Sequence, residues 1–149
     1  MKRIKTWILI ADGSKARIAR NDGPGRGVKA VSGGEFHGRN LPSRKIASDR
    51  PGRSFDSAGR GRHAMEPPTD PREHEKQAFI TRVAAFLDKK AKQGSYDRLV
   101  LVAPPRVLGY LRNGLSDAVR HKVTAELGKD LTQVPLHELV DYLAPVLAV

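Results

Sequence analysis

The sequence predicts an α/β fold, in which a mixed central sheet of about five strands carries helices packed on it. In the second half of the chain, short apolar runs typical of strands alternate with segments whose apolar residues recur at helical spacing. A length of 149 residues matches one domain and can bury a hydrophobic core. Only 5% of the sequence is aromatic, so Val, Leu, Ile and Ala must build that core. We therefore expect a single domain over residues 1–149.

A β-hairpin is predicted at the start of the chain. Residues 6–11 form a short apolar run, and the Asp12-Gly13 pair that follows is typical of a tight turn. Residues 15–20 then alternate polar and apolar side chains, as a strand with one buried face does. Residues 28–31 predict a third strand, which Gly33-Gly34 should end.

Residues 35–70 show no hydrophobic period and are rich in Gly, Pro, Ser and Arg. Packing cannot fix such a segment, so we expect a long, exposed, flexible basic loop within the domain. Structureless segments of this length are uncommon inside compact domains, and they are usually either functional or disordered. Two interpretations stay open: a loop that carries the function, and a flexible insertion without a role.

A strong start signal for a helix follows this loop. Asp70 can cap the helix, Pro71 suits its first position, and Glu73 completes a capping box. Apolar residues recur at helical spacing as far as about Lys92, and Gly94 ends the run. The core face of this helix is predicted to consist of Phe79, Ile80, Val83, Ala84, Phe86, Leu87 and Ala91.

The remaining residues predict two strands and three helices. Residues 99–103 are continuously apolar, which is typical of a strand covered on both faces. Leu and Val recur at helical spacing between residues 107 and 119, and Gly109 and Gly114 indicate a break between two short helices. Residues 123–127 are expected to form a final strand. A C-terminal helix near Pro135 should follow, with Leu136, Leu139, Val140 and Leu143 on its apolar face.

The formal net charge of +11 is unevenly distributed along the chain. Residues 1–65 hold 15 Lys or Arg against 5 Asp or Glu, whereas residues 66–149 hold 12 against 11. A local excess of this kind creates a field that attracts polyanions, and phosphate contacts are its usual use. We expect a nucleic-acid partner. The alternatives are an acidic membrane surface, an anionic polysaccharide, and a solvated basic face that binds nothing specific.

The absence of cysteine excludes disulfides, thiol catalysis and Cys-ligated zinc, and it favours a reducing compartment. The apolar run at residues 7–11 is shorter than a secretory signal or a membrane span requires. We therefore expect a cytoplasmic protein without membrane insertion. The glycine runs at residues 23–27 and 33–34 match neither phosphate-binding fingerprint, so we expect no small-molecule cofactor. The sequence does not indicate an oligomeric state.

The most distinctive stretch of the predicted loop is SAGRGRHAM at residues 57–65. Its two arginines offer planar donors that match phosphate oxygens, and its glycines let the backbone come close to a partner. Further cations extend the same charge upstream. The predicted RNA-contacting residues are Arg39, Arg44, Lys45, Arg50, Arg53, Gly59, Arg60, Gly61 and Arg62.

Imidazole and carboxylate groups, which suit zinc or manganese, gather where this loop meets the helix. They belong to His63, Glu66, His74 and Glu75. Two prolines follow the first pair, and the members of the second pair point to different faces of a helical turn. We therefore expect no metal site.

Acidic residues near strand ends can hold magnesium in a nuclease. The candidates here are Asp12, Asp97 and Asp117. An Asp-Gly turn explains Asp12 on backbone grounds alone. A serine nucleophile has no placed His-Asp pair in the sequence, so neither chemistry is predicted.

Four segments together resemble the bacterial host-attachment proteins, small proteins described as required for attachment to host cells. They are WILIADGSKAR at residues 7–17, RHAMEPPTDP at 62–71, APPRVLG at 103–109 and KDLT at 129–132. The resemblance covers nearly the whole chain. That family in turn resembles the middle domain of the class I peptide-chain release factors of archaea and eukaryotes. This likeness implies a mixed sheet related to ribonuclease H-like and ribosomal-protein folds, with rRNA or tRNA on the ribosome as the partner.

In the release factors, the loop between sheet and long helix carries Gly-Gly-Gln, which helps water attack the peptidyl-tRNA ester. The corresponding loop here carries GRGRH at residues 59–63, and the nearest glutamine is Gln77, in the predicted helix. This departure argues against efficient peptidyl-tRNA hydrolysis and makes an enzyme the weaker expectation. His63 could replace the glutamine, because an imidazole can orient water or move a proton near neutral pH.

Three functions are thus compatible with the sequence. The first is a release-factor-like module that binds RNA or the ribosome without efficient hydrolysis. The second is a factor required for attachment to host cells, which an indirect route through gene expression would explain better than direct adhesion. The third is a hydrolase of peptidyl-tRNA or RNA that uses His63.

Overall fold

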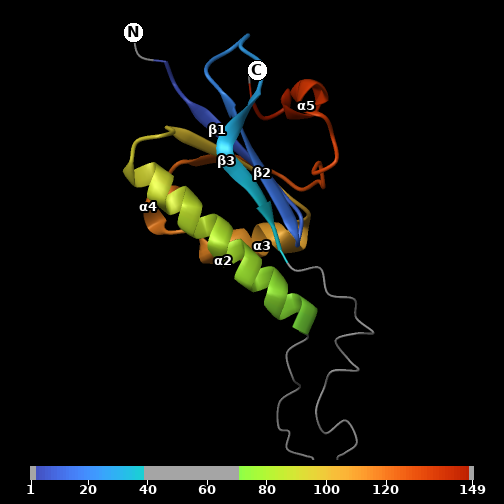
Figure 1. Cartoon of the computed structure of the whole chain (residues 1–149). Coiled ribbons are helices and arrows are strands. Elements are labelled where there is room, and N and C mark those ends of the chain that lie inside the picture. Colours follow the sequence, from blue (N-terminus) through green and yellow to red (C-terminus); the bar gives the residue numbers. More distant parts are fainter. Residues whose placement is uncertain (1–2, 39–70, 148–149) are drawn as a thin grey trace, which may run out of the picture.

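The computed structural model describes residues 3–38 and 71–147. Its elements in chain order are β1 (Thr6–Ala11), β2 (Lys15–Asn21), β3 (Lys29–His37), α2 (Pro71–Lys92), β4 (Arg98–Val102), α3 (Pro105–Gly114), α4 (Asp117–Arg120), β5 (Val123–Leu127) and α5 (Leu136–Leu143). The five strands form one sheet in the order β3-β2-β1-β4-β5 (Figure 1). β1 pairs antiparallel with β2 and parallel with β4, and β5 is parallel to β4. The predicted α/β fold with a mixed five-stranded sheet is confirmed.

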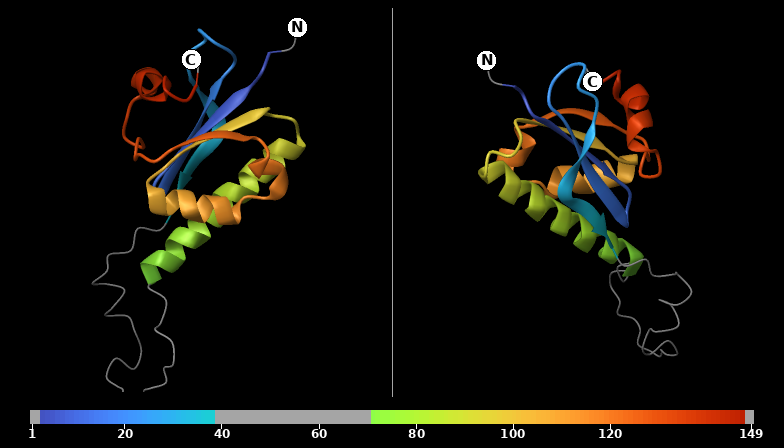
Figure 2. Two further views of the ribbon diagram at one scale, coloured as in Figure 1. Left: turned by 180° about the vertical axis from the view of Figure 1, so that it is seen from behind. Right: turned by 45° about the horizontal axis from the view of Figure 1, so that its top comes forward.

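The sheet lies between two layers of helices. Helices α2, α3 and α4 cover one face, and α5 covers the other (Figures 1 and 2). Side chains alternate along β1 accordingly: Trp7 and Leu9 pack under the three helices, whereas Ile8 and Ile10 pack under α5. The predicted burial of the 99–103 strand on both faces is confirmed in β4, because Leu101 joins the first cluster and Val102 the second.

The predicted end of the third strand is wrong. β3 does not stop at Gly33-Gly34 but continues to His37, so the first residues of the predicted loop belong to the sheet. Gly33 adopts φ +74°, and the pairing with β2 shifts register between Arg17 and Ala19. A bulge of this kind absorbs the glycines and lets pairing resume beyond them. A Cβ on Gly34 would lie 3.0 Å from the Cβ of Ile18, so this approach requires glycine.

The later elements follow the predicted order, with one difference inside α3. Gly109 lies within this helix and causes no break, whereas Gly114 ends it. Ser116 then caps α4, because its hydroxyl accepts a hydrogen bond of 3.2 Å from the backbone N–H of Val119. α3 begins directly after β4, with Pro105 in its first turn. The start of α3 therefore lies close to the carboxyl end of a parallel strand.

Candidate functional site

Segments from distant parts of the chain meet at the carboxyl ends of the three parallel strands. We call this region the carboxyl-end surface and define it as residues 12–17, 35–38, 71–76, 104–106 and 128–132. β4 and β5 end side by side, since the N–H of Ala103 donates a 3.0 Å hydrogen bond to the carbonyl of Leu127. In open α/β sheets, ligands bind in the crevice beyond the carboxyl ends of the strands. This surface is therefore the first place to seek a site.

The hairpin turn of this surface is built by Asp12. Its Oδ1 accepts hydrogen bonds of 2.7 Å from the backbone N–H groups of Ser14 and of Lys15. Its Oδ2 lies 3.5 Å from the hydroxyl of Thr132, in the segment that follows β5. The carboxylate thus holds the turn and faces a residue 120 positions away. Asp12 therefore stabilises the hairpin turn, as the Asp-Gly pair in the sequence predicts.

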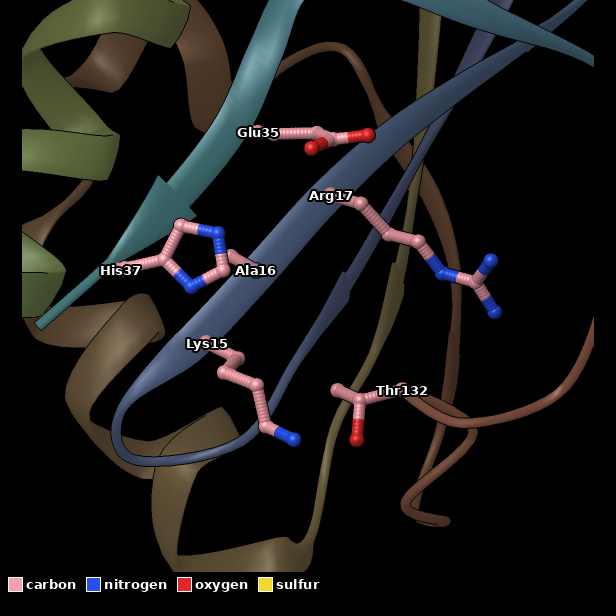
Figure 3. A pocket seen from close by; sticks show the side chains of 6 residues that line it. All are labelled: Lys15, Ala16, Arg17, Glu35, His37 and Thr132. Carbon is pink, nitrogen blue, oxygen red and sulfur yellow. The ribbon is translucent and has the colours of Figure 1, made fainter.

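A shallow hollow of ≈ 180 Å³ opens beside this turn (Figure 3). Its lining combines two cations, a carboxylate, an imidazole and a hydroxyl, from Lys15, Arg17, Glu35, His37 and Thr132, with Ala16 between them. Two cross-strand pairs place these groups, because Lys15 lies opposite His37 and Arg17 opposite Glu35. Alternate residues of a strand share a face, so all four side chains lie on the same side of the sheet.

The guanidinium of Arg17 ties this hollow to the segment before α5. Its Nη2 donates to the carbonyl oxygens of Val134 and of Leu131, the latter at 2.9 Å. Within the described residues, the buried Nε of Arg17 has no hydrogen-bond partner. Burial lowers the pKa of Arg17 below its ordinary value, and the carboxylate of Glu35 opposes that shift. An arginine remains charged under both influences, so the hollow keeps a fixed positive group.

On the other side of the hairpin turn, Glu73 gathers three donors. Its Oε1 accepts hydrogen bonds from Arg106 at 3.1 Å and from Lys76 at 3.3 Å, and its Oε2 accepts one from the Tyr110 hydroxyl. These contacts fasten the first turn of α2 to α3. Lys76 also runs along the turn, because a Cβ on Gly13 would lie 2.9 Å from its side chain. Glu73 therefore serves tertiary packing, whereas its predicted capping partner Asp70 lies outside the described residues.

The two described residues that flank segment 39–70, Gly38 and Pro71, both lie on this surface. Before it, the N–H of Gly38 donates a 2.6 Å hydrogen bond to the carbonyl of Ser14. The guanidinium of Arg82 donates another, of 3.1 Å, to the carbonyl of His37. After the segment, Pro71 begins α2. The chain therefore leaves the carboxyl-end surface and returns to it.

The residues predicted to contact RNA lie outside the part of the chain that the structure describes. They are Arg39, Arg44, Lys45, Arg50, Arg53, Gly59, Arg60, Gly61 and Arg62, and the same holds for His63. Within residues 3–38 and 71–147, no group of three or more His, Asp or Glu side chains could hold a metal ion. His74 is exposed on the first turns of α2.

The acidic residues considered for a nuclease are not brought together. Asp12 follows β1, whereas Asp97 precedes β4. Because these two strands are parallel, the two carboxylates lie at opposite ends of the strands. Asp97 accepts a 2.8 Å hydrogen bond from the backbone N–H of Lys5, and Asp117 forms an ion pair with Arg120.

The hollow beside Arg17 was not predicted from the sequence, although part of its signal is present. Lys15 and Arg17 are polar residues two apart on a strand, which predicts a shared face. Glu35 and His37 repeat that spacing, but the sequence places them in a loop rather than on a strand. Thr132 has no local signal at all, because only the tertiary fold brings it to the hairpin.

Fold and surface together define a small α/β domain with a mixed five-stranded sheet and a charged carboxyl-end surface. The family model described as "Protein required for attachment to host cells" matches residues 7–143. The chain belongs to this family, as its sequence resemblance indicates. All four segments that carry the resemblance contribute described residues to the carboxyl-end surface. The segment at residues 62–71 contributes Pro71 alone.

Two known proteins are similar to parts of this chain or to its shape. The uncharacterized protein RP470 of Rickettsia prowazekii (strain Madrid E) is 34% identical over 71 residues, which are 46% of this chain and 47% of that protein. The crystal structure of the archaeal translation termination factor aRF1 matches with a TM-score of 0.49 and 12% identity, covering 95% of this chain and 38% of that one. This chain thus matches less than half of each protein. None of the described helices combines the length and apolar character that crossing a bilayer requires.

Proposed function

We propose that this protein binds RNA, and that it contacts the phosphate backbone through the carboxyl-end surface and the basic segment attached to it. One observation carries the proposal. Lys15, Arg17 and His37 line one hollow of that surface, and segment 39–70 starts directly beyond it. Phosphate oxygens accept hydrogen bonds from all three side-chain types, the imidazole included.

The charge of the adjoining segment supports this assignment. Residues 39–65 hold seven Lys or Arg and two Asp or Glu. Gly38 and Pro71, which flank segment 39–70 in the sequence, lie on the carboxyl-end surface, so this basic segment adjoins that surface along the chain. Binding that neutralises several phosphates releases counterions, so such a region favours RNA over a single small anion.

The acidic residues of the surface do not cancel this charge, because most are engaged within the protein. Glu73 accepts hydrogen bonds from three side chains, and Asp12 holds the hairpin turn. Asp130 accepts from the N–H and the hydroxyl of Thr132, at 3.0 and 2.6 Å. Lys15 and His37, in contrast, are exposed. Glu35 is exposed in the same hollow, and its carboxylate interacts with the charge of Arg17.

The family's description names a requirement for attachment to host cells. An RNA-binding protein would meet that requirement indirectly, by controlling the synthesis of factors that act at the surface. Cell fractionation distinguishes this route from direct adhesion. Recovery of the protein from the cell exterior would contradict the indirect route.

The proposal is tested by filter binding of the full chain to a labelled single-stranded RNA and to tRNA across a salt series. The logarithm of the affinity should fall with the logarithm of salt concentration, with a slope set by the number of neutralised phosphates. Lys15→Gln should weaken binding and reduce that slope by about 1. Arg120→Gln removes an equal charge from α4, away from the surface, and should change neither. A slope near zero for the unmodified chain would contradict the proposal.

A further inference from the structure

A second positively charged hollow lies at the opposite end of the sheet. We call it the amino-end groove; it has a volume of ≈ 430 Å³ and is lined by Lys5, Trp7, Arg20, Ala30, Val31, Ser32, Lys90 and Ser95. Lys5 precedes β1, Arg20 is near the end of β2, and Lys90 is in the last turn of α2. The start of β3 supplies the remaining wall. None of these residues belongs to the carboxyl-end surface.

The lining of this groove is chemically simple. It contains three cations and two serine hydroxyls, and none of its residues is acidic. Two carboxylates interact with lining residues from outside the groove: Asp22 lies 3.8 Å from the Nε of Arg20, and Asp97 accepts a hydrogen bond from the backbone N–H of Lys5. Ammonium, guanidinium and hydroxyl groups are the donors that proteins use for phosphate oxygens.

Two of the cations are held in place before any ligand arrives. The ammonium of Lys5 donates a 3.1 Å hydrogen bond to the carbonyl of Gly94. The ammonium of Lys90 lies 5.5 Å from the ring centre of Phe86. The Phe86 ring in turn stacks on Trp7, with 6.3 Å between the two ring centres. A charge fixed in this way loses less side-chain freedom when it binds, so the groove is preorganised for an anion.

The C-terminus of α2 offers an alternative explanation for part of this charge. Cations near a helix C-terminus stabilise the helix through its dipole, and Lys89, Lys90 and Lys92 all lie in the last turn. That effect explains neither Lys5, which precedes β1, nor Arg20, which lies on β2. Nor does it explain why only Lys90 of the three faces the groove.

We propose that the amino-end groove is a second phosphate-contact site for the RNA strand bound at the carboxyl-end surface, so this inference rests on the proposed function. The two sites lie along the edge strand β3 but on opposite faces of the sheet. Residues 30–32 line the groove on the face covered by α2, whereas Glu35 and His37 line the hollow on the face covered by α5. At about 3.3 Å per residue, the seven steps along the strand from Lys5 to Asp12 span roughly 23 Å. An RNA strand that passes around the β3 edge, from one face of the sheet to the other, would contact both sites.

Trp7 gives a direct probe of this groove, since it is the one tryptophan of the chain and lines the groove wall. RNA binding by the full chain is followed by the anisotropy of a labelled RNA, and groove occupancy by Trp7 fluorescence in the same titration. A phosphate that reaches Lys90 changes the electric field at the neighbouring rings. Both signals should therefore saturate at the same RNA concentration.

The decisive comparison uses two neighbouring lysines. Lys90→Glu should lower RNA affinity about three- to ten-fold, reduce the salt slope by about 1 and abolish most of the Trp7 response. Lys89→Glu makes the same charge change in the same helical turn, outside the groove, and should change RNA binding much less. Thermal melts of both variants show whether either change acts through stability instead.

Each outcome decides something. Equal effects of the two substitutions on affinity, or RNA binding without a Trp7 response, would overturn the groove while leaving the proposed function intact. No RNA binding by the unmodified chain would overturn both. A saturable Trp7 response to inorganic pyrophosphate that matches the response to RNA would show that the groove takes small phosphate anions, and would also overturn it as an RNA contact.

Discussion

The backbone N–H of Gly38 donates a hydrogen bond of 2.6 Å to the carbonyl oxygen of Ser14, which joins the end of β3 to the hairpin turn. Phe79 of α2 packs against the same glycine from the other side. Gly38 thus contacts both the hairpin and the helix, and it is half-buried. The point from which segment 39–70 departs is set by these contacts rather than by the segment itself.

Gly38→Ala should destabilise the protein. Its Cβ would lie 3.0 and 3.2 Å from two ring carbons of Phe79, so this ring, which is 1% exposed, would have to shift by a few tenths of an ångström. We expect the free energy of unfolding to fall by about 1–2 kcal/mol, measured by urea denaturation. Gly128→Ala is the matched control, because its Cβ would meet nothing closer than 3.7 Å. Equal midpoints for the two variants would contradict the close packing of Gly38.

Glu73 and Tyr110 should show energetic coupling. The Tyr110 hydroxyl donates to a carboxylate that also accepts from two cations, so removing either partner leaves a half-buried polar group with fewer bonds. We expect Glu73→Ala and Tyr110→Phe each to cost about 1 kcal/mol and the double variant less than their sum. A double-mutant cycle in urea measures the difference.

The exposed ion pair of Asp88 and Lys92, at 3.0 Å, serves as the reference for this cycle. Its lysine side chain is 74% exposed, so the corresponding coupling should stay below about 0.5 kcal/mol. Strict additivity of the Glu73 and Tyr110 substitutions would show that their contact adds no stability.

Tyr96 should make the fold sensitive to alkaline pH. Burial raises the pKa of its phenol well above the ordinary value, and the negative charge of Asp88 raises it further. The neutral phenol is the form that the folded state favours, and it donates a 2.8 Å hydrogen bond to the carbonyl of Leu87. The contribution of this phenol to the free energy of unfolding is fully present below about pH 10, the pKa of a tyrosine in the unfolded chain. It is lost as pH rises further, because the phenol ionises more readily in the unfolded chain than in the folded one.

We therefore expect the free energy of unfolding to fall between about pH 10 and pH 12, and Tyr96→Phe to flatten that decline. Lysines that titrate in the same range affect the unmodified chain and the Tyr96→Phe variant alike. The difference between their two declines therefore reports the ionisation of the Tyr96 phenol. Tyr142→Phe is the control, since Tyr142 is 40% exposed and should leave the decline unchanged. A decline of equal steepness in the Tyr96→Phe variant would exclude this linkage.

The parts of the fold that the sequence predicts are those set by local pattern. The continuous apolar run of β4 and the helical spacing of α2 reflect burial that neighbours in the sequence share. β3 differs, because its pairing beyond Gly33 depends on β2 and on a bulge that no local pattern shows. Propensity correctly marks Gly33 as unfavourable in a strand, but cross-strand pairing overrides it.

The candidate site is predictable only in part for the same reason. An Asp-Gly turn is a local signal, and the structure confirms its geometry at Asp12. The contact of Asp12 with Thr132 requires the carboxyl ends of β1 and β5 to lie at the same end of the sheet. The topology sets this arrangement, and no local pattern shows it. Likewise, the amino-end groove combines Lys5, Arg20 and Lys90 from three elements, and none of them is distinctive in the sequence.

Arg17 should hold the segment before α5 in place. Arg17→Met keeps the apolar stem but removes the donor shared by the carbonyls of Leu131 and Val134. We expect the free energy of unfolding to fall by about 1–2 kcal/mol. Hydrogen exchange at the α5 amides should accelerate more than exchange in β1, because the loss is local.

The same substitution at Arg20 separates this role from a general effect of charge. Arg20 lies on the same strand, is 48% exposed, and pairs with Asp22 rather than with the segment before α5. Arg20→Met should therefore leave exchange at α5 unchanged. If both variants accelerated exchange at α5 equally, the hydrogen bonds of Arg17 would not be what fastens this segment, and apolar packing of Leu139 and Leu143 under the sheet would have to do so alone.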